Sequence, residues 1–413
     1  MLMKMLFFEI KKVFSKPINK VALLILLAVL VVGSFLTIRD VKYVTEDGTT
    51  ISGVAAAHYL KEERNKWAGD ITENVLIDVI RENQAVQSSG GAQSENERMT
   101  DIAYAKTQGI SDIKQMITLA FGSFDDYDYY LADRVSADEV GEFYERRVES
   151  LREYLYSDEI SDTYSEEEKA FLLGRYENLE TPFYYEYTDG WKALMDSQYM
   201  PTLMMILVLV AGFFVAGIFS DEFSLKADSI FFSSRLGRNK AVAAKIGAGV
   251  VIVTVIYWTV MLLYSLIVLG ALGFDGGVCW IQTGVSNWRS FYNITYFQDW
   301  AFTLLGGYVG SLFILTLAML ISAKTRSTVL AITIPFILTC VPPFFGKIAW
   351  LSRIMTLFPD QLLRLNKSLE DFSLYQIRGK IFGAMSIIIP VYSILLCFIV
   401  PAMYIVYRRT QIK

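Results

Sequence analysis

The sequence has very few of the residues that most often bind metals or act as nucleophiles. Among its 413 residues there is one histidine, His58, and there are three cysteines, at positions 279, 340 and 397. A single histidine without a cysteine nearby makes a poor metal site, so we expect His58 to be an ordinary surface or core residue. The acidic region around it has no cysteine, so no disulfide is expected there.

Nucleotide-binding and hydrolase signatures are also missing. A P-loop needs G-x-x-x-x-G-K-[ST], and the pairs Gly346-Lys347 and Gly379-Lys380 lack both the earlier glycine and the following Ser or Thr. The patterns G-x-S-x-G, H-E-x-x-H and C-x-x-C do not occur. We therefore expect that the chain is not an enzyme by itself, binds no cofactor or metal, and has no nucleic-acid partner.

Charge is absent from six long stretches of a chain that is 53% hydrophobic. A helix needs about 20 apolar residues to cross the hydrocarbon core, where its backbone groups find no water. A buried helix of a soluble protein could explain one of these stretches, Ser327–Gly346, but hardly all six. We predict six transmembrane helices, in the runs Val21–Ile38, Ser197–Ser220, Ile246–Phe274, Ala301–Ala323, Ser327–Gly346 and Ile381–Tyr407.

These six runs contain no Asp, Glu, Lys, Arg or His. Carriers that are driven by protons or ions generally place ionisable groups inside the bilayer, where such groups mark the ion path. Their absence argues against a secondary transporter. If the protein moves a substrate, we expect the energy to come from outside the membrane.

Lysine and arginine are distributed unevenly about the six runs. Fifteen of them lie before the first run, between the second and third, between the fourth and fifth, and after the sixth. The positive-inside rule places these segments and both termini in the cytoplasm of a plasma-membrane protein. A cleaved signal peptide is the alternative for the first run, but the run has 18 residues and VVGSFLTI lacks a clear A-x-A site.

The region between the first two runs has the opposite charge. Residues 39–199 contain 34 acids and 16 bases, a net charge of −18, whereas the rest of the chain has a net charge of +13. We predict an all-α polytopic membrane protein with a mainly helical extracytoplasmic domain inserted between spans one and two. The predicted divisions are 1–38, with an interfacial N-terminal helix and span one, 39–199 and 200–413.

Local patterns support helices in this domain. Ser136 with Glu139, and Ser165 with Glu168, have capping-box spacing. The segment Gln87–Glu97 is a flexible loop by composition. The aromatic stretch Pro182–Trp191 precedes span two, and a membrane-interface anchor is favoured over a ligand platform.

Two further features concern the spans. The loop between spans five and six has six bases, and its pieces IAWLSRIMTLF and DQLLRL predict short amphipathic helices on the outer surface within 347–380. Small residues at Gly306 and Gly310, and more loosely at Gly212 and Ala216, suit close helix packing or a subunit interface.

The segment Ser220–Lys245 is charged although it lies between two uncharged spans. At its start, Phe219, Phe223, Ala227 and Ile230 would share one helical face, and Glu222 with Lys226 forms a favourable i,i+4 pair. We predict an amphipathic helix that breaks at Gly237. A loop that only fixes topology would need fewer residues, so a docking element is favoured.

The layout resembles the ABC-2 type permease family, the membrane subunits of type V ABC exporters. The resemblance lies in FSDEFSLKADSIFFSSRLGRNKAVAAK, where Glu222, Arg238 and Lys245 fit the family pattern, and in the six spans and basic ends. It covers about 250 residues, all but the inserted domain. Members often have Gly-Thr where this chain has Lys226-Ala227. Some bacterial members carry a helical outer domain with a Tyr-rich stretch, to which FYYEYTDGW is similar.

The resemblance implies that segment 220–245 is a coupling helix seated on a separate cytoplasmic ATPase subunit, which binds ATP and Mg. The N-terminal helix would lie against that subunit or the inner-leaflet lipids through Lys4, Lys11 and Lys12. Two permeases, identical or related, would enclose the substrate path. The implied docking residues are Glu222, Phe223, Lys226, Arg235, Arg238 and Lys245.

Three functions stay open at this point. The first is an exporter permease for an amphipathic or hydrophobic peptide, lipid or drug, with export direction implied by the resemblance alone. The second is a membrane-anchored sensor whose acidic domain binds a ligand and signals through a partner. The third is a channel or carrier that works alone. The acidic domain could attract cationic peptides, but a role in solubility is favoured.

Overall fold

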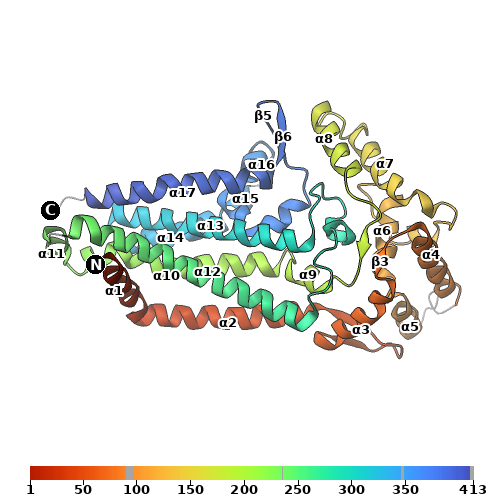
Figure 1. The fold of residues 1–413 in the computed structure, drawn as a ribbon, viewed down its shortest axis with the longest axis horizontal. Helices are drawn as coiled ribbons and strands as arrows, with labels where there is room; N and C mark the ends of the chain where they lie inside the picture. Colours follow the sequence, from red (N-terminus) through yellow and green to blue (C-terminus); the bar gives the residue numbers. More distant parts are fainter. Residues whose placement is uncertain (90–96, 235, 346–347, 410–413) are drawn as a thin grey trace.

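The computed structural model describes residues 1–89, 97–234, 236–345 and 348–409. Figure 1 shows a bundle of long helices with a smaller helical domain beyond one end, while α1 and the last turns of α17 lie at the other end. Within the described residues, six helices are long and apolar enough to cross a membrane, as predicted. The chain is therefore a mostly helical, multi-pass membrane protein.

The bundle is built from these six spans and two shorter helices. Helix α1 (Leu2–Ser15) precedes the first span, and α11 (Asp228–Ser233) lies between the second and third. The spans are α2 (Pro17–Asp40), α9 with α10 (Asp189–Leu194, Tyr199–Ser224), the π-helical turn η4 with α12 (Gly237–Ala241, Val242–Leu272), α13 (Tyr296–Thr325), α14 with α15 (Thr328–Cys340, Pro342–Phe345) and α17 (Ala384–Arg408).

Helix ends follow local sequence signals. Pro17 stands in the first turn of α2, where its missing N–H costs no hydrogen bond. Thr295 and Gln298 form a capping box at the start of α13. That helix ends at Arg326, whose φ of 60° is left-handed, and the side chain of Ser327 then caps α14. The turn between spans four and five is therefore short and defined.

Helices α10 and α13 form the centre of the bundle. In each of these two helices, 67% of the 18-residue apolar stretch is buried inside the protein. The same fraction is only 22–28% in α2, α14 and α17. The outer surfaces of these three helices expose large apolar side chains, such as Leu24, Phe336 and Phe398. An apolar exterior of this kind suits contact with lipid.

The inserted domain is mainly helical, as predicted. Its helices are α3 (Val54–Arg64), α4 (Glu73–Gln87), α5 (Glu97–Thr107), α6 (Ser111–Phe121), α7 (Phe143–Leu155) and α8 (Glu166–Glu177), with short turns η1 (Asn65–Trp67), η2 (Leu131–Asp133) and η3 (Val140–Glu142). Two antiparallel strand pairs close it, β1 (Lys42–Val44) with β2 (Thr50–Ser52) and β3 (Gly69–Asp70) with β4 (Tyr184–Tyr185).

The domain has a core of its own, and a loop of the bundle completes it. Ile80, Ile113 and Phe143 are fully buried in this core. Trp288 joins them from the segment between α12 and α13, which also contains turns η5 (Ile281–Thr283) and η6 (Val285–Asn287). The domain therefore rests on the α12–α13 connection and is not held only by its two chain links.

The predicted local signals in the domain had different outcomes. The capping box of Ser165 and Glu168 forms at α8. Ser136 and Glu139 also bond to each other's backbone N–H, but the turn η3 follows and the α-helix begins only at Phe143. The predicted loop Gln87–Glu97 begins where α4 ends, and residues 90–96 lie outside the described part of the chain.

Most rings of the aromatic stretch before span two pack inside the protein, and only Tyr184, which is 41% exposed, is open to the predicted role as a membrane-interface anchor. Phe183, Tyr185 and Tyr187 are fully buried, and Trp191 is nearly so. The backbone of Tyr184 and Tyr185 pairs with β3, which turns the rings on one side into the domain core. The stretch therefore joins the domain to the bundle by protein–protein packing.

The connection between spans five and six also differs from the prediction. It contains α16 (Ala349–Met355), turn η7 (Pro359–Leu369) and a hairpin of β5 (Leu374–Ile377) with β6 (Lys380–Gly383). Turn η7 is not on the surface, because Leu362, Leu363 and Leu365 are 3% exposed or less and pack against α13. The hairpin occupies the first residues of the sixth apolar run, so α17 begins only at Ala384.

The small residues pack helices within this chain. A Cβ on Gly306 would lie 3.0 Å from Leu365, and one on Gly310 would lie 2.7 Å from Leu362. A Cβ on Gly212 would meet Pro335 of α14, and the carbonyl of Ala216 accepts a hydrogen bond from Ser322 of α13. These contacts fill the space beside the small residues, as close helix packing requires, and the alternative of a subunit interface there stays a prediction.

Candidate functional site

A buried ionic cluster lies at the bundle end that carries α1. The side chain of Lys245, at the start of α12, is fully buried. Its Nζ lies 2.8 Å from Oε1 of Glu222 and 3.1 Å from Oε2 of Glu9, and it donates to the carbonyl of Ile218 at 3.0 Å. Lys12 reaches the same Glu222 oxygen at 2.8 Å. Since α1, α10 and α12 each supply a member, the cluster fixes these three helices together.

Helix α1 packs on the bundle through its apolar face. Val13 is 4% exposed, and the rings of Phe14 and Phe214 are 5.6 Å apart. A second ion pair joins Lys16 to Asp221 at 2.5 Å. Lys4 and Lys11 are exposed, whereas Lys12 belongs to the cluster, so the three lysines do not form one docking face.

The segment after α10 is not one amphipathic helix, which corrects the sequence prediction. Helix α10 ends at Ser224, and Lys226 has a left-handed φ of 54°. The predicted pair of Glu222 with Lys226 is replaced by the pairs of Glu222 with Lys12 and Lys245. Phe219 is fully buried whereas Ile230 is 76% exposed, so they do not share a face.

Burial divides the predicted docking residues into two groups. Lys245 is fully buried and Glu222 is 9% exposed, so in this structure both contact other helices of the chain, and their role in docking stays a prediction. Phe223 is half-buried and Lys226 is exposed. Arg235 lies outside the described residues.

Arg238 organises the turn that follows α11. Its Nε donates to the carbonyl of Phe232 at 3.2 Å, and its Nη1 donates to the carbonyl of Arg408 at 3.1 Å. Gly237 is required beside it, because a Cβ there would lie 1.7 Å from the carbonyl oxygen of Phe231. Arg238 therefore holds α11 against the end of α17.

The C-cap of α10 and helix α11 each expose one large apolar residue, and we call these two positions the tip. Leu225 and Ile230 are 70% and 76% exposed, and Lys226 next to Leu225 and Lys240 in η4 are also exposed. Beneath the tip, aromatic rings from α10, α11 and α17 pack together, with centroid distances of 4.6–6.3 Å. The tip is thus a rigid projection between the second and third spans.

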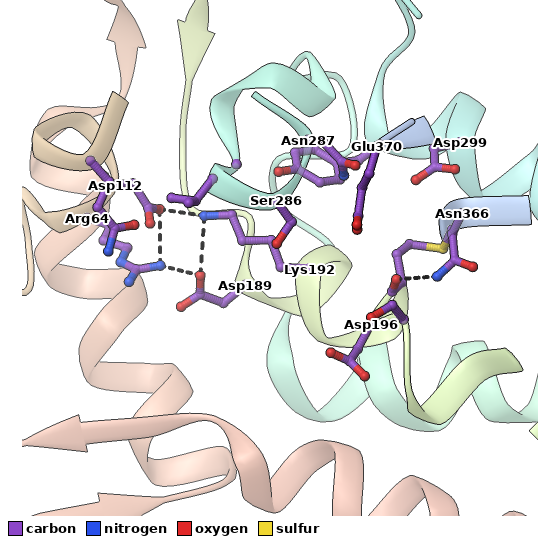
Figure 2. A pocket seen from close by; sticks show the side chains of 16 residues that line it. Arg64, Asp112, Asp189, Lys192, Asp196, Ser286, Asn287, Asp299, Asn366 and Glu370 are labelled. Carbon is purple, nitrogen blue, oxygen red and sulfur yellow. Dashed lines mark hydrogen bonds and ion pairs between the residues drawn. The ribbon is translucent and has the colours of Figure 1, made fainter. Parts of the chain in front are cut away.

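A polar pocket lies at the opposite end, where the inserted domain meets the bundle. Its cavity volume is about 330 Å³. Figure 2 shows Arg64, Asp112, Asp189 and Lys192 gathered on one side of it, and Asp299, Asn366 and Glu370 on the other. We call this space the junction pocket.

The first side of the junction pocket is an internally neutral network. Arg64 contacts both Asp112, at 3.1 Å, and Asp189, and Lys192 lies 2.7 Å from Asp112 and 3.7 Å from Asp189. The hydroxyl of Tyr185 donates to Asp112 at 3.1 Å. Burial alone would raise the pKa of Asp112, but Arg64 and Lys192 outweigh burial and hold that pKa below its ordinary value.

The second side has acceptors without donors. Asp299, in the first turn of α13, is 1% exposed, and Asn366 is 5% exposed. Thr303 donates to Oδ1 of Asp299, and Asn366 donates to the carbonyl of Met195 at 2.6 Å. Among the residues that the structure describes, Oδ2 of Asp299 and Oδ1 of Asn366 have no hydrogen-bond partner. Buried acceptors without a partner are rare in folded proteins.

No protein-family model matches the chain, and no curated protein matches it. The functional assignment therefore depends on the geometry of the tip and of the junction pocket. Within the described residues, no group of three or more His, Cys, Asp or Glu side chains is arranged to hold a metal ion. His58 is exposed on α3, 3.7 Å from Glu62.

The sequence contained little that could have located the junction pocket. Its two sides combine residues from the domain, from α9, from the start of α13 and from η7, which are far apart along the chain. One signal in the sequence pointed to it. Asp299 stands two residues before the fourth uncharged run, so a helix that continues from this run would bury its side chain in the bundle. An acid so close to a span is costly unless it is used or paired.

Proposed function

We propose that the chain is the membrane permease subunit of an ATP-driven exporter of the ABC-2 type, and that a separate ATPase subunit docks on the tip. The observation that carries this proposal is the exposed pair Leu225 and Ile230 on a braced projection between two spans. Exposed apolar patches mark interaction sites, and the fully buried core of an interface is more apolar than its rim.

The ionic cluster supplies a route for mechanical coupling. A partner that moves the tip would move α10 and α12 together, because Lys245 joins both helices to α1. Arg238 extends this rigid unit to α17. In this proposal Glu222, Lys245 and Arg238 transmit the movement, and Leu225 and Ile230 make the contact.

The orientation follows from charge. The segments at the tip end carry the fifteen bases, so this end faces the cytoplasm, and the domain of net charge −18 lies outside the cell. An apolar groove of about 500 Å³ between α2 and α10 faces the lipid side of the bundle. A second permease copy or a paralogue would close the path along this side for an amphipathic or hydrophobic substrate.

The test is purification of the tagged full-length protein from its own host in a mild detergent, with an ATPase assay and mass spectrometry of bound subunits. We expect a P-loop ATPase to co-purify with the wild type. The amount of ATPase that co-purifies with the double variant Leu225→Asp and Ile230→Asp should be lower by a factor of at least about ten. Val54→Asp is the matched control, because Val54 is 56% exposed on the inserted domain. An ATPase that is absent from the wild type, or retained by the double variant, would contradict the proposal.

A membrane-anchored sensor is the second candidate, and the junction pocket favours it. A sensor would respond to a ligand in that pocket and would need no ATPase. The purification above separates the two, since a sensor brings down a signalling partner without ATPase activity.

A further inference from the structure

We propose that the junction pocket binds an organic cation, with a primary ammonium or guanidinium group placed between Asp299, Asn366 and Glu370. This site does not depend on the exporter proposal, because the pocket is built by the inserted domain and the outer bundle end and does not involve the tip. The inference rests on the charge balance of the pocket, on two buried acceptors and on the size of the cavity.

The charge balance leaves an excess of carboxylates. Of the five acids that line the pocket, Asp112 and Asp189 are neutralised by Arg64 and Lys192. Asp196 and Glu370 have no basic partner among the described pocket residues, since the two bases of the pocket are already engaged, and Asp299 adds a buried oxygen without a donor. Such a lining repels anions and attracts a positive group.

Hydrogen-bonding capacity points in the same direction. One oxygen of Asp196 accepts from the backbone N–H groups of Gln198 and Tyr199, at 2.8 and 3.1 Å. Oδ2 of Asp299 and Oδ1 of Asn366 accept nothing within the described structure. A ligand with several N–H donors would satisfy both acceptors, whereas a ligand with acceptors alone would satisfy neither.

Asp196 and Glu370 line the same pocket from two different elements, the link between α9 and α10 and the end of η7. Partial desolvation raises the pKa of Glu370, the neighbouring charges of Asp371 and Asp196 raise it further, and Lys367 lowers it. A cation between them would relieve their repulsion.

Size and geometry define the ligand class. A cavity of about 330 Å³ holds a short alkyl chain with a terminal amine or guanidinium group. A bound metal ion would need several convergent oxygen ligands, and within the described residues no such group of carboxylates exists. The geometry thus points to an amine such as a polyamine or a basic side chain of a peptide.

The experiment is a titration of the full-length protein in lipid nanodiscs, without any ATPase, by calorimetry at moderate and high salt. The probes are 1,5-diaminopentane, agmatine, the uncharged 1,5-pentanediol and magnesium chloride. We expect the two cations to bind at both salt concentrations and the diol and magnesium not to bind. Measurement at high salt separates a site from general attraction to the acidic domain, because salt screens exposed charges.

Asp299→Asn keeps the shape of the side chain and should weaken amine binding by at least about tenfold, because a buried charge pair is lost. Glu370→Gln, at an exposed position, should weaken it by about threefold and keeps the test decisive if the first variant folds poorly. Asp78→Asn, whose side chain is 62% exposed on α4, should bind like the wild type. The inference would be overturned if the wild type binds no amine, or if both pocket variants bind the amine as tightly as the wild type. Binding of magnesium in place of the amines would also overturn it.

Discussion

Lys245 and Glu222 form an ion pair of 2.8 Å at the bundle end that carries α1, and the side chain of Lys245 is fully buried there. Glu222 is shared, since Lys12 approaches the same oxygen from α1. Two charges removed from water are tolerated only when each has a partner. The pair therefore makes the positions of α10 and α12 dependent on one another and on α1.

We expect Lys245→Met to lower stability by about 3–5 kcal/mol, because Glu9 loses its ion-pair partner and Glu222 keeps only Lys12. Thermal unfolding of the purified protein in detergent measures the effect. Lys11→Met is the matched control, since Lys11 is exposed on α1. Adding Glu222→Gln to Lys245→Met should restore part of the loss, and a single variant that unfolds like the wild type would show that the pair is not structural.

A second prediction concerns the contact between α13 and η7. Gly310→Ala places a Cβ 2.7 Å from the Cβ of Leu362, so helix and turn must move apart, at a cost of about 1–3 kcal/mol. Gly270→Ala in α12 is the control, because nothing lies within 4 Å of the added atom. The control should be neutral or slightly stabilising, since alanine favours helices more than glycine. Equal melting temperatures for the two variants would argue against this packing.

The six spans could be predicted because the bilayer imposes a length and an absence of charge that are visible in a single stretch of sequence. The same is true of the cap at Ser165, which depends on residues three apart. The positions of Lys245 and Asp299 could not be predicted in this way. Their surroundings come from α1, α10, η7 and the inserted domain, and local pattern carries no information about such distant neighbours.

Two local predictions, the pair of Glu222 with Lys226 and the surface helix DQLLRL, were wrong for the same physical reason. Glu222 and Lys226 have the spacing of a surface helix pair, but a buried lysine on another helix is a stronger partner for Glu222 than an exposed one on its own. DQLLRL has the composition of a surface helix, yet its leucines fill the space left by Gly306 and Gly310. In both cases tertiary burial outweighs local preference.

Acid should weaken the junction between the domain and the bundle. The pKa of Asp112 is held below its ordinary value in the folded protein by Arg64 and Lys192 against the opposing effect of burial. A carboxyl group with a depressed folded pKa stabilises the protein above its unfolded pKa of about 3.9, and this contribution is lost as the pH falls further. We expect unfolding on acidification below about pH 4 to be less steep in Asp112→Asn, which is also less stable at pH 7. Melting temperatures between pH 3 and 7 measure both effects, and parallel curves for variant and wild type would contradict the assignment.

Cys279 should resist thiol reagents in the folded protein. It is fully buried between the domain and the bundle, and burial raises the pKa of its thiol to about 12, so almost no reactive thiolate exists at neutral pH. Iodoacetamide at pH 8 should modify it slowly in the native state and fully after denaturation, as followed by peptide mass spectrometry. A cysteine introduced by Val54→Cys, at a position that is 56% exposed, gives the rate of an accessible thiol. If native Cys279 reacts as fast as that cysteine, the α12–α13 connection opens readily and the domain is not seated on the bundle as described.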